Sequence, residues 1–111
     1  MWYLTFSKPA STREQIIPHL QEHLDWQRNA HDSGGMLYSG PSADFSMGIM
    51  LLRAESLDDA KKTMDSEPFH KLGLRTYEII EWDVHQGMGI GGFTSESLAL
   101  LGKEKASGAT S

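Results

Sequence analysis

The sequence predicts one α+β domain in which the ferredoxin-like order βαββαβ builds an antiparallel sheet. That order follows from short runs of β-branched and aromatic residues that alternate with stretches whose apolar residues recur at helical spacing. The chain has 111 residues, and surface scaling predicts about 6,000 Å² exposed when folded against about 18,000 Å² unfolded, enough for one modest core. A central run, Ile49 to Leu52, is apolar on both faces, which indicates a sheet covered on both sides. Two helices cover one face, so we expect a second copy on the other, giving a homodimeric α+β barrel.

Composition excludes several classes of function. The formal net charge is −5 and no run of Lys or Arg occurs, which argues against nucleic acid or an anionic membrane surface as a partner. The chain has no cysteine, which excludes a disulfide framework, a thiol nucleophile and a zinc thiolate site. No apolar run has the length of a membrane span, and the N-terminus lacks the basic start of a signal peptide. A cytoplasmic enzyme or binding domain is therefore expected.

The N-terminal third of the chain predicts a strand followed by a helix. Trp2 to Phe6 is aromatic and β-branched, so a strand is expected from the first residues. Ser11 and Glu14 have the spacing of a capping box, which predicts a helix start. Because proline breaks a helix beyond its first turn, Pro18 predicts either a short turn followed by a helix from about Ile17, or one kinked helix. One stripe at helical spacing would hold Leu20, His23, Leu24, Gln27 and Ala30.

The middle of the chain predicts two strands separated by a loop. Gly34-Gly35 ends the helix, and residues 36–39 form a short second strand closed by Gly40-Pro41. Residues 42–45 are read as a loop. Residues 46–54 form the third strand, which contains the run that is apolar on both faces.

The next stretch predicts a helix, a further helical turn and a strand. Ser56 is the expected N-cap, with acidic residues in the first turn, and the helix should run to about Ser66. Its buried stripe would consist of Leu57, Ala60 and Met64. Residues 67–72 predict a helical turn ended by Gly73, and residues 74–84 the fourth strand.

Residues 86–111 are expected to form a glycine-rich C-terminal extension to a domain of residues 1–85. Three of its residues are too apolar for a free linker: Met88, Ile90 and Phe93. We expect that part to pack on its own barrel or across the partner, and the end from Gly102 to be disordered. The glycines of residues 87–92 formally match a dinucleotide fingerprint, but too little chain follows for the βαβ unit it requires.

His23 is the first candidate for chemistry, because it lies at a helical position with largely apolar neighbours. Imidazole titrates near neutral pH, and a carboxylate on one ring nitrogen fixes the tautomer and leaves the other nitrogen as a base or an acid. The structural alternative is a helix histidine satisfied by a backbone carbonyl. His19 lies four residues earlier, the spacing of a metal clip, but spacing identifies no third ligand, so no metal site is predicted.

Four short motifs, in their order and spacing, resemble the YciI-like (YCII-related) family over roughly residues 1 to 85. They are Trp2 to Phe6, His23-Leu24, Gly40-Pro41, and Glu67-Pro68-Phe69 with Gly73. The family's His-Leu pair precedes its Gly-Pro pair by seventeen residues, as His23 precedes Gly40 here. Its Asp-Pro-aromatic motif precedes a glycine by six, as Glu67 precedes Gly73 here. The resemblance implies a dimeric ferredoxin-like barrel with a His–Asp dyad in a small pocket. It also implies kinship with muconolactone isomerase-like proteins, and one branch is similar to dehydrochlorinases of chlorinated hydroxyhydroquinone breakdown.

The chain departs from the family pattern at two positions. Glu67 stands where the family usually has Asp. The longer glutamate can still reach the imidazole, or Asp65 takes this role instead. Leu20 stands where many members carry an arginine three residues before the histidine, which removes the basis for an anion-binding role at that position.

Together these features predict a small cofactor-free enzyme, a lyase or an isomerase, that acts on a ring metabolite of aromatic or chloroaromatic catabolism. His23 would be the general acid or base, and Glu67 or Asp65 would orient it. The expected substrate-binding residues are Trp2, Phe69 and His70. Nothing in the sequence requires a metal or a redox cofactor. The alternative is a non-catalytic dimeric domain of the same fold that binds a small apolar ligand, and the fold alone does not separate the two.

Overall fold

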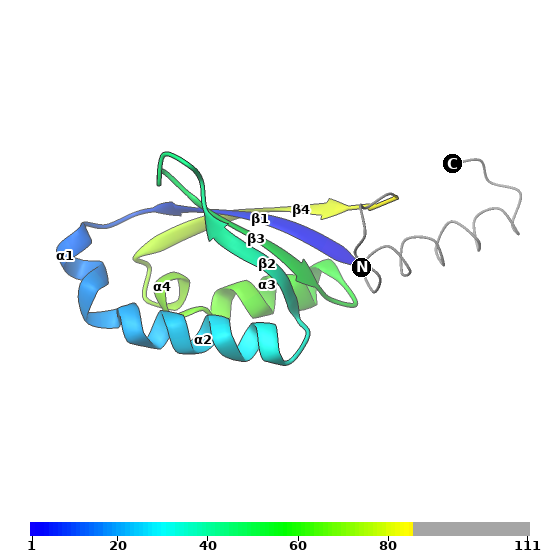
Figure 1. The fold of residues 1–111 in the computed structure, drawn as a ribbon, viewed down its shortest axis with the longest axis horizontal. Coiled ribbons are helices and arrows are strands. Elements are labelled where there is room, and N and C mark those ends of the chain that lie inside the picture. The colour runs from blue at the N-terminus through cyan, green and yellow to red at the C-terminus, as the bar shows by residue number, and fades with distance from the viewer. Residues whose placement is uncertain (86–111) are drawn as a thin grey trace, which may run out of the picture.

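The computed structural model describes residues 1–85 of the chain (Figure 1). Its elements, in order, are β1 (Trp2–Pro9), α1 (Arg13–Ile16), the 3₁₀ helix η1 (Ile17–His19), α2 (Leu20–Asp32), β2 (Met36–Pro41), β3 (Gly48–Arg53), α3 (Leu57–Ser66), α4 (Pro68–Lys71) and β4 (Arg75–Trp82). With α1, η1 and α2 as the first helical region and α3 with α4 as the second, this is the βαββαβ order, so the predicted ferredoxin-like fold is confirmed. The expectations for residues 86–111 lie outside the described residues.

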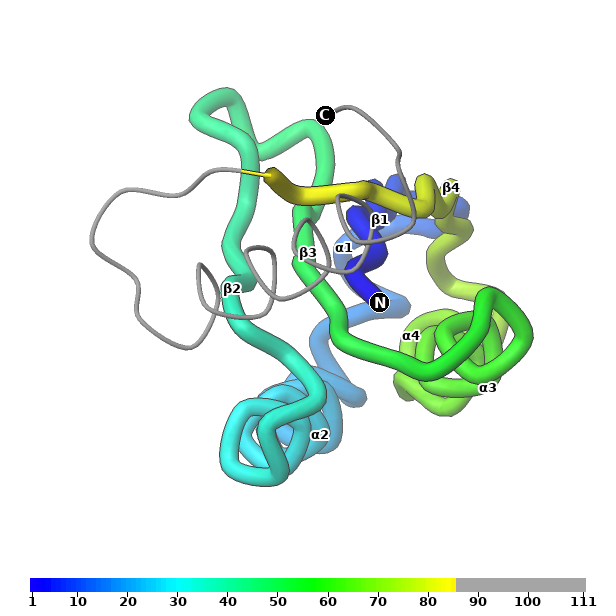
Figure 2. The backbone as a smooth tube through the Cα atoms, turned by 90° about the vertical axis from the view of Figure 1, so that its right-hand side faces the viewer, coloured from blue at the N-terminus to red at the C-terminus, as the bar shows by residue number. Residues whose placement is uncertain are grey.

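The sheet is antiparallel, with the strand order β2-β3-β1-β4. The central strand β1 pairs on both sides, so that Thr5 lies opposite Met50 of β3 and Ile79 of β4. The helices of residues 1–85 lie on one face of the sheet (Figure 1), with α2 toward the β2 side and α3 and α4 toward the β4 side (Figure 2). None of the helices among residues 1–85 is long and apolar enough to cross a bilayer.

The core lies between the sheet and the helices. Because side chains alternate along a strand, Tyr3, Thr5 and Ser7 of β1 face the helices, and all three are buried. The main buried cluster consists of Tyr3, Met36, Met50, Leu52, Ala60 and Met64, with Trp26 and Ile79 packed against it. Two of the three residues predicted to form the buried stripe of α3 are in this cluster, whereas Leu57 is exposed.

The other face of the sheet carries none of the described helices (Figure 1). Several large apolar side chains on this face are exposed to solvent, including Ile80, which is 53% exposed, and Trp82, which is 44% exposed. A shallow hollow on this face is lined by Leu4, Tyr38, Leu51 and Trp82, among others. These residues form the open sheet face, which is the face on which the sequence predicts a second copy.

The start of the first helical region differs from the prediction by one residue. Thr12, not Ser11, is the N-cap, and Gln15, not Glu14, completes the capping box. The Ser11 hydroxyl donates instead to the backbone oxygen of Leu74, so it links the end of β1 to the start of β4. Because the Ser11 hydroxyl has this tertiary partner, Thr12 caps α1 instead.

Pro18 divides the first helical region into a short turn and a long helix, the first of the two alternatives predicted, but the long helix begins three residues later than the expected Ile17. A short helix precedes it, the proline lies in η1, and the long helix α2 begins at Leu20. Because a proline has no N–H for an intrahelical bond, the break occurs there. Of the predicted stripe, Leu20 and Leu24 are exposed, whereas His23 and Gln27 lie partly buried beside the pocket described next.

Candidate active site

Glu67 owes its position to the proline that follows it. A residue before proline avoids the helical conformation, and Glu67 has φ −65° and ψ 129°, so α3 ends at Ser66. Pro68 then begins the new helix α4, for which Glu67 is the N-cap. Its Oε2 accepts hydrogen bonds from the N–H groups of Phe69 (3.1 Å) and His70 (3.2 Å). The side chain is fully buried, so α4 holds the carboxylate in one orientation.

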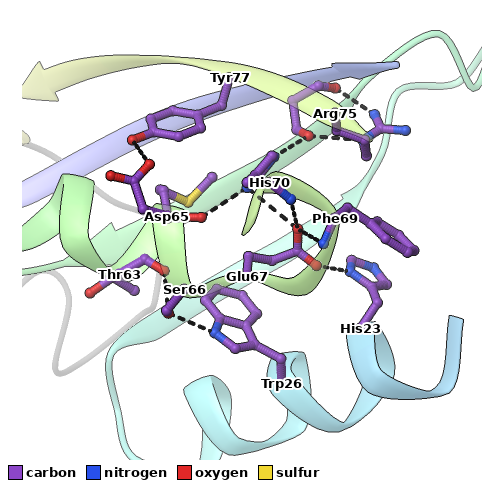
Figure 3. A network of polar contacts seen from close by, with 12 residues as sticks. His23, Trp26, Thr63, Asp65, Ser66, Glu67, Phe69, His70, Arg75 and Tyr77 are labelled. Atoms are coloured by element: carbon purple, nitrogen blue, oxygen red, sulfur yellow. Dashed lines mark hydrogen bonds and ion pairs between the residues drawn. The ribbon is translucent and has the colours of Figure 1, made fainter. Parts of the chain in front are cut away.

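His23 of α2 meets this carboxylate from the facing helix, as Figure 3 shows. Its Nδ1 lies 2.5 Å from Oε1 of Glu67, and its ring stacks on the ring of Phe69 with centroids 4.3 Å apart and planes 13° apart. A carboxylate oxygen only accepts, so Nδ1 carries the proton. No side chain or backbone group of residues 1–85 hydrogen-bonds Nε2. The His23 side chain is 16% exposed, which leaves part of it open to the pocket.

The charge state of Glu67 follows from its neighbours. Burial alone raises the pKa of this carboxyl group. The interaction with His23, above all its hydrogen bond, and the Phe69 N–H outweigh burial, so the pKa is lowered below its ordinary value of 4.5. Glu67 is therefore an anion at neutral pH and stabilises an imidazolium at His23.

The pocket beside this pair has a volume of about 270 Å³, near the lower end of the range of about 300–1,000 Å³ usual for small-molecule sites. Helices α2 and α4 form one side of it, and the ends of the strands form the other. Its lining includes Ser7, His23, Gln27, Gly40, Phe45, Met47, Ile49, Glu67, Phe69 and Arg75. Larger hollows of about 450 and 350 Å³ lie elsewhere, but they are lined by neither His23 nor Glu67.

Phe45 lies on the loop between β2 and β3 and lines the pocket, although its side chain is 79% exposed. Its φ of 60° lies in the left-handed region, which is rare for a bulky residue. Asp44 holds this loop, because its Oδ1 accepts hydrogen bonds from the hydroxyls of Ser42 and Ser46 and from the Ser46 N–H. These bonds lower the pKa of Asp44 to about 2.

A second polar cluster lies on the far side of Glu67 from His23 (Figure 3). Nδ1 of His70 lies 3.0 Å from the backbone oxygen of Met64, to which it donates, and Nε2 lies 2.7 Å from Oγ of Ser7. Burial lowers the pKa of His70 and the nearby Arg75 charge lowers it further, so the ring is neutral and Nε2 accepts the Ser7 proton. Arg75 donates from Nε to Ser7 Oγ (2.9 Å) and from Nη2 to the Ser7 backbone oxygen (2.6 Å).

The structure separates the two acids considered for His23. Glu67 contacts the imidazole, whereas Asp65 lies on α3 and accepts a hydrogen bond from the Tyr77 hydroxyl at 2.7 Å. Burial, together with the hydrogen bond to Asp65 and its charge, raises the pKa of Tyr77 to about 12. Asp65 therefore belongs to a contact between α3 and β4 and not to the pocket.

The three residues expected to bind substrate have different positions. Phe69 lines the pocket and stacks on His23. His70 is buried behind the wall, where it contacts the pocket residue Ser7. Trp2 does not line the pocket but packs with Leu51 and Val84 in a separate cluster. Its place follows from alternation along β1, since Trp2 faces away from Tyr3 and thus away from the helices.

Sequence reasoning missed Ser7 and Arg75. Both line the pocket, yet each belongs to a strand whose pattern signals only a core. Antiparallel pairing of β1 with β4 places Arg75 opposite Pro9 in the sheet, close to Ser7. No group of three or more His, Asp or Glu side chains among residues 1–85 is placed to hold a metal ion. His19, the other histidine of the possible metal clip, has its Nδ1 3.7 Å from Oε1 of Glu22.

Comparison with known proteins identifies a family and solved structures of similar fold. The YCII-related domain family matches residues 1–83 of the chain. The fold is similar to that of 5-chloro-2-hydroxyhydroquinone dehydrochlorinase from Burkholderia phenoliruptrix AC1100, solved in complex with 2,5-dihydroxybenzoquinone. The TM-score is 0.65 at 21% sequence identity, over 78% of this chain and 96% of that chain, which shows a shared fold. No curated protein matches the chain in sequence.

Proposed function

The chain belongs to the YCII-related family, and from this premise we propose that it is a small acid–base enzyme acting on a ring metabolite of aromatic or chloroaromatic catabolism. The observation that carries the proposal is the His23–Glu67 pair on the wall of a 270 Å³ pocket. A carboxylate bound to Nδ1 leaves Nε2 as the group that exchanges a proton with a substrate. A pocket of this size suits a single substituted ring.

The two residues have different roles in this proposal. His23 takes or gives the proton through Nε2, the general acid–base role, which typically contributes about 10²–10⁴ in rate. Glu67 holds the imidazole in one tautomer and stabilises the imidazolium, and it does not itself transfer the proton. Because Glu67 is buried and bound by two backbone N–H groups of α4, this orientation exists before substrate binds.

Elimination of HCl is the reaction that we favour, since a solved structure of similar fold is that of a dehydrochlorinase of a chlorinated hydroxyhydroquinone. In such a reaction His23 would deliver a proton to the chlorine-bearing ring carbon and take one from a ring hydroxyl. Chloride then leaves with the electron pair of the C–Cl bond while a second ring hydroxyl loses its proton to the solvent, and the ring becomes a quinone. The net change is loss of HCl, so no oxidant or hydride acceptor takes part. An isomerase would use the same two proton transfers without a leaving group.

The test is a panel of chlorinated and unchlorinated hydroxyquinols and of lactones, followed by absorbance and by chloride release. Turnover of at least one ring compound by the full chain, lost in His23→Ala, is the expected result. If no compound is turned over but ring compounds bind in the pocket with His23 intact, the chain is the non-catalytic binding domain instead. Chloride release without His23 dependence would place the chemistry elsewhere.

We also propose that the chain is a homodimer that joins two open sheet faces. That face leaves three large side chains with mostly apolar surface about half exposed: Ile80, Trp82 and Tyr38. Burying such side chains contributes about 25 cal/mol per Å² of apolar surface removed from water. A two-fold pairing would give each copy the same contacts.

A further inference from the structure

The guanidinium of Arg75 is held along one edge and left open along the other. Nε and Nη2 donate to the hydroxyl and the backbone oxygen of Ser7, and these two bonds fix the plane of the group. The N–H groups of Nη1 have no hydrogen-bond partner among residues 1–85. Arg75 lines the same pocket as His23, so the open edge is available to a molecule in that pocket.

The positive charge of Arg75 has no counterion of its own in the described part of the chain. No carboxylate of residues 1–85 lies within ion-pair distance of the guanidinium. Glu67 is near enough to act on Arg75 through its charge, but its oxygens are bound to His23 and to the backbone of α4. A partly buried cation without a close partner loses hydration, and an anion placed beside it would offset that cost.

Ser7 and His70 act as the support for this group. The Ser7 proton points to Nε2 of His70 and its oxygen accepts from Arg75, so the hydroxyl is occupied on both sides. Ser7 is 2% exposed. A serine in this state is a poor nucleophile, although it lies within hydrogen-bond distance of a histidine. Its position favours a structural role as the anchor of the guanidinium.

We propose that Arg75, anchored by Ser7, forms an anion subsite, and that the substrate of the proposed enzyme is a ring compound bearing a negatively charged oxygen. This inference rests on the proposed function. The charged oxygen is either a carboxylate or an ionised ring hydroxyl, since both present the same acceptor to a guanidinium edge. With the oxygen bound to Arg75, the ring lies in the pocket that His23 also lines.

Binding to the full chain, measured by calorimetry with two matched pairs of probes, tests the subsite. One pair is 4-hydroxybenzoate and its uncharged methyl ester; the other is 2,5-dihydroxybenzoquinone, which ionises at neutral pH, and its 2,5-dimethoxy analogue. The anion of at least one pair should bind more tightly than its neutral partner. Arg75→Gln should weaken that anion about 10- to 100-fold, the loss expected for one charge-assisted hydrogen bond, and leave the neutral compound unchanged. The pair that shows the preference identifies the carboxylate or the ring oxygen as the group recognised.

The matched control is Arg28→Gln, which makes the same change in charge at an exposed position on α2 outside the pocket lining. It should bind every probe as the native chain does. Ser7→Ala keeps the charge but removes the anchor, so it should weaken the anion by less than Arg75→Gln. If Arg75→Gln does not fold, the native chain still tests the subsite, because added salt should weaken the binding of the anion and not the binding of its neutral partner.

Three results would overturn the subsite: equal affinity for both members of each pair, an anion preference that survives Arg75→Gln, or one lost equally in Arg28→Gln. These results are independent of turnover. If the anion preference depends on Arg75 but no compound is turned over, the proposed enzyme fails and the subsite stands. If His23-dependent turnover is found without that preference, the enzyme stands and the subsite fails. Loss of turnover in Ser7→Ala with unchanged anion affinity would make Ser7 a nucleophile and contradict its role as an anchor.

Discussion

Glu67 has two tasks that usually fall to different residues. It caps α4 through Oε2 and binds His23 through Oε1, so the local turn and the contact between helices depend on one carboxylate. The chemistry proposed for His23 therefore depends on where a proline ends the preceding helix.

At the catalytic pair we expect His23→Ala to reduce turnover about 10²–10⁴-fold while the assembly stays intact, because a positioned acid–base group is lost. Glu67→Gln should cost less than His23→Ala, since an amide keeps the shape but no longer stabilises the imidazolium. Asp65→Asn is the control, and its turnover should be native, because Asp65 contacts Tyr77 and not His23. Steady-state kinetics measure all three. Full activity in His23→Ala would remove the catalytic interpretation.

The stability of the fold should fall on mild acidification because of His70. Its pKa is lowered in the folded state from the ordinary 6.5, so the unfolded chain binds the proton more tightly. The contribution of the neutral ring is complete above pH 6.5 and is lost as the pH falls below that value toward the folded pKa. Glu67, also lowered, adds a second loss only below its ordinary value of 4.5.

Chemical denaturation between pH 8 and pH 5 checks this expectation, with His70→Gln as the comparison. Glutamine cannot titrate but can still accept the Ser7 proton, so the variant should show a smaller loss of stability below about pH 6.5. An identical decline in both proteins would assign the pH dependence to other groups.

At the scale of an element, the loop between β2 and β3 presents Phe45 at the pocket in a conformation that disfavours it. A left-handed backbone costs a residue with a side chain about 1–2 kcal/mol, whereas a glycine there adds about 0.5–1 kcal/mol of unfolded-chain entropy. Phe45→Gly should therefore leave stability unchanged or slightly higher. It should also raise KM for a pocket substrate, because the ring lines the pocket.

Thermal melting and steady-state kinetics together measure that prediction. Asp44→Ala is the companion variant, since it keeps the phenyl ring but removes the carboxylate that orders the loop. Asp44→Ala should raise KM, as Phe45→Gly does, but should not increase the stability of the fold. An unchanged KM in both variants would mean that Phe45 does not contribute to binding.

For the whole molecule, the open sheet face predicts the assembly. Light scattering at micromolar concentration should give twice the 12.4 kDa of one chain, because Ile80 and Trp82 are large apolar side chains left about half exposed. Ile80→Lys should produce monomers, since an isologous interface would place the two new charges close together. Lys62→Glu, exposed on α3 on the helical side of the sheet, should not. A native monomer would contradict the proposed dimer.

The sequence by itself determined the order of elements, and it did so through interactions between near neighbours. Alternation along Trp2 to Phe6, the Ser56 cap, the break at Pro18 and the turn at Gly73 are all local, and the structure shows each of them. The cap of α1 was predicted one residue early because Ser11 has a distant partner, the backbone oxygen of Leu74. Local patterns cannot register such a contact.

Only the tertiary structure decided which side chains meet. Asp65 and Glu67 are two residues apart, and the sequence left Asp65 open as an alternative to Glu67. The helical backbone at Asp65 turns it to Tyr77, whereas the extended backbone at Glu67 turns it to His23. Ser7 and Arg75 are brought together by pairing between β1 and β4 across most of the chain. Hydrogen bonds between elements depend on how those elements pack, and packing depends on every residue between them. For this reason the strands could be predicted from the sequence, whereas the residues that line the pocket were decided by the tertiary structure.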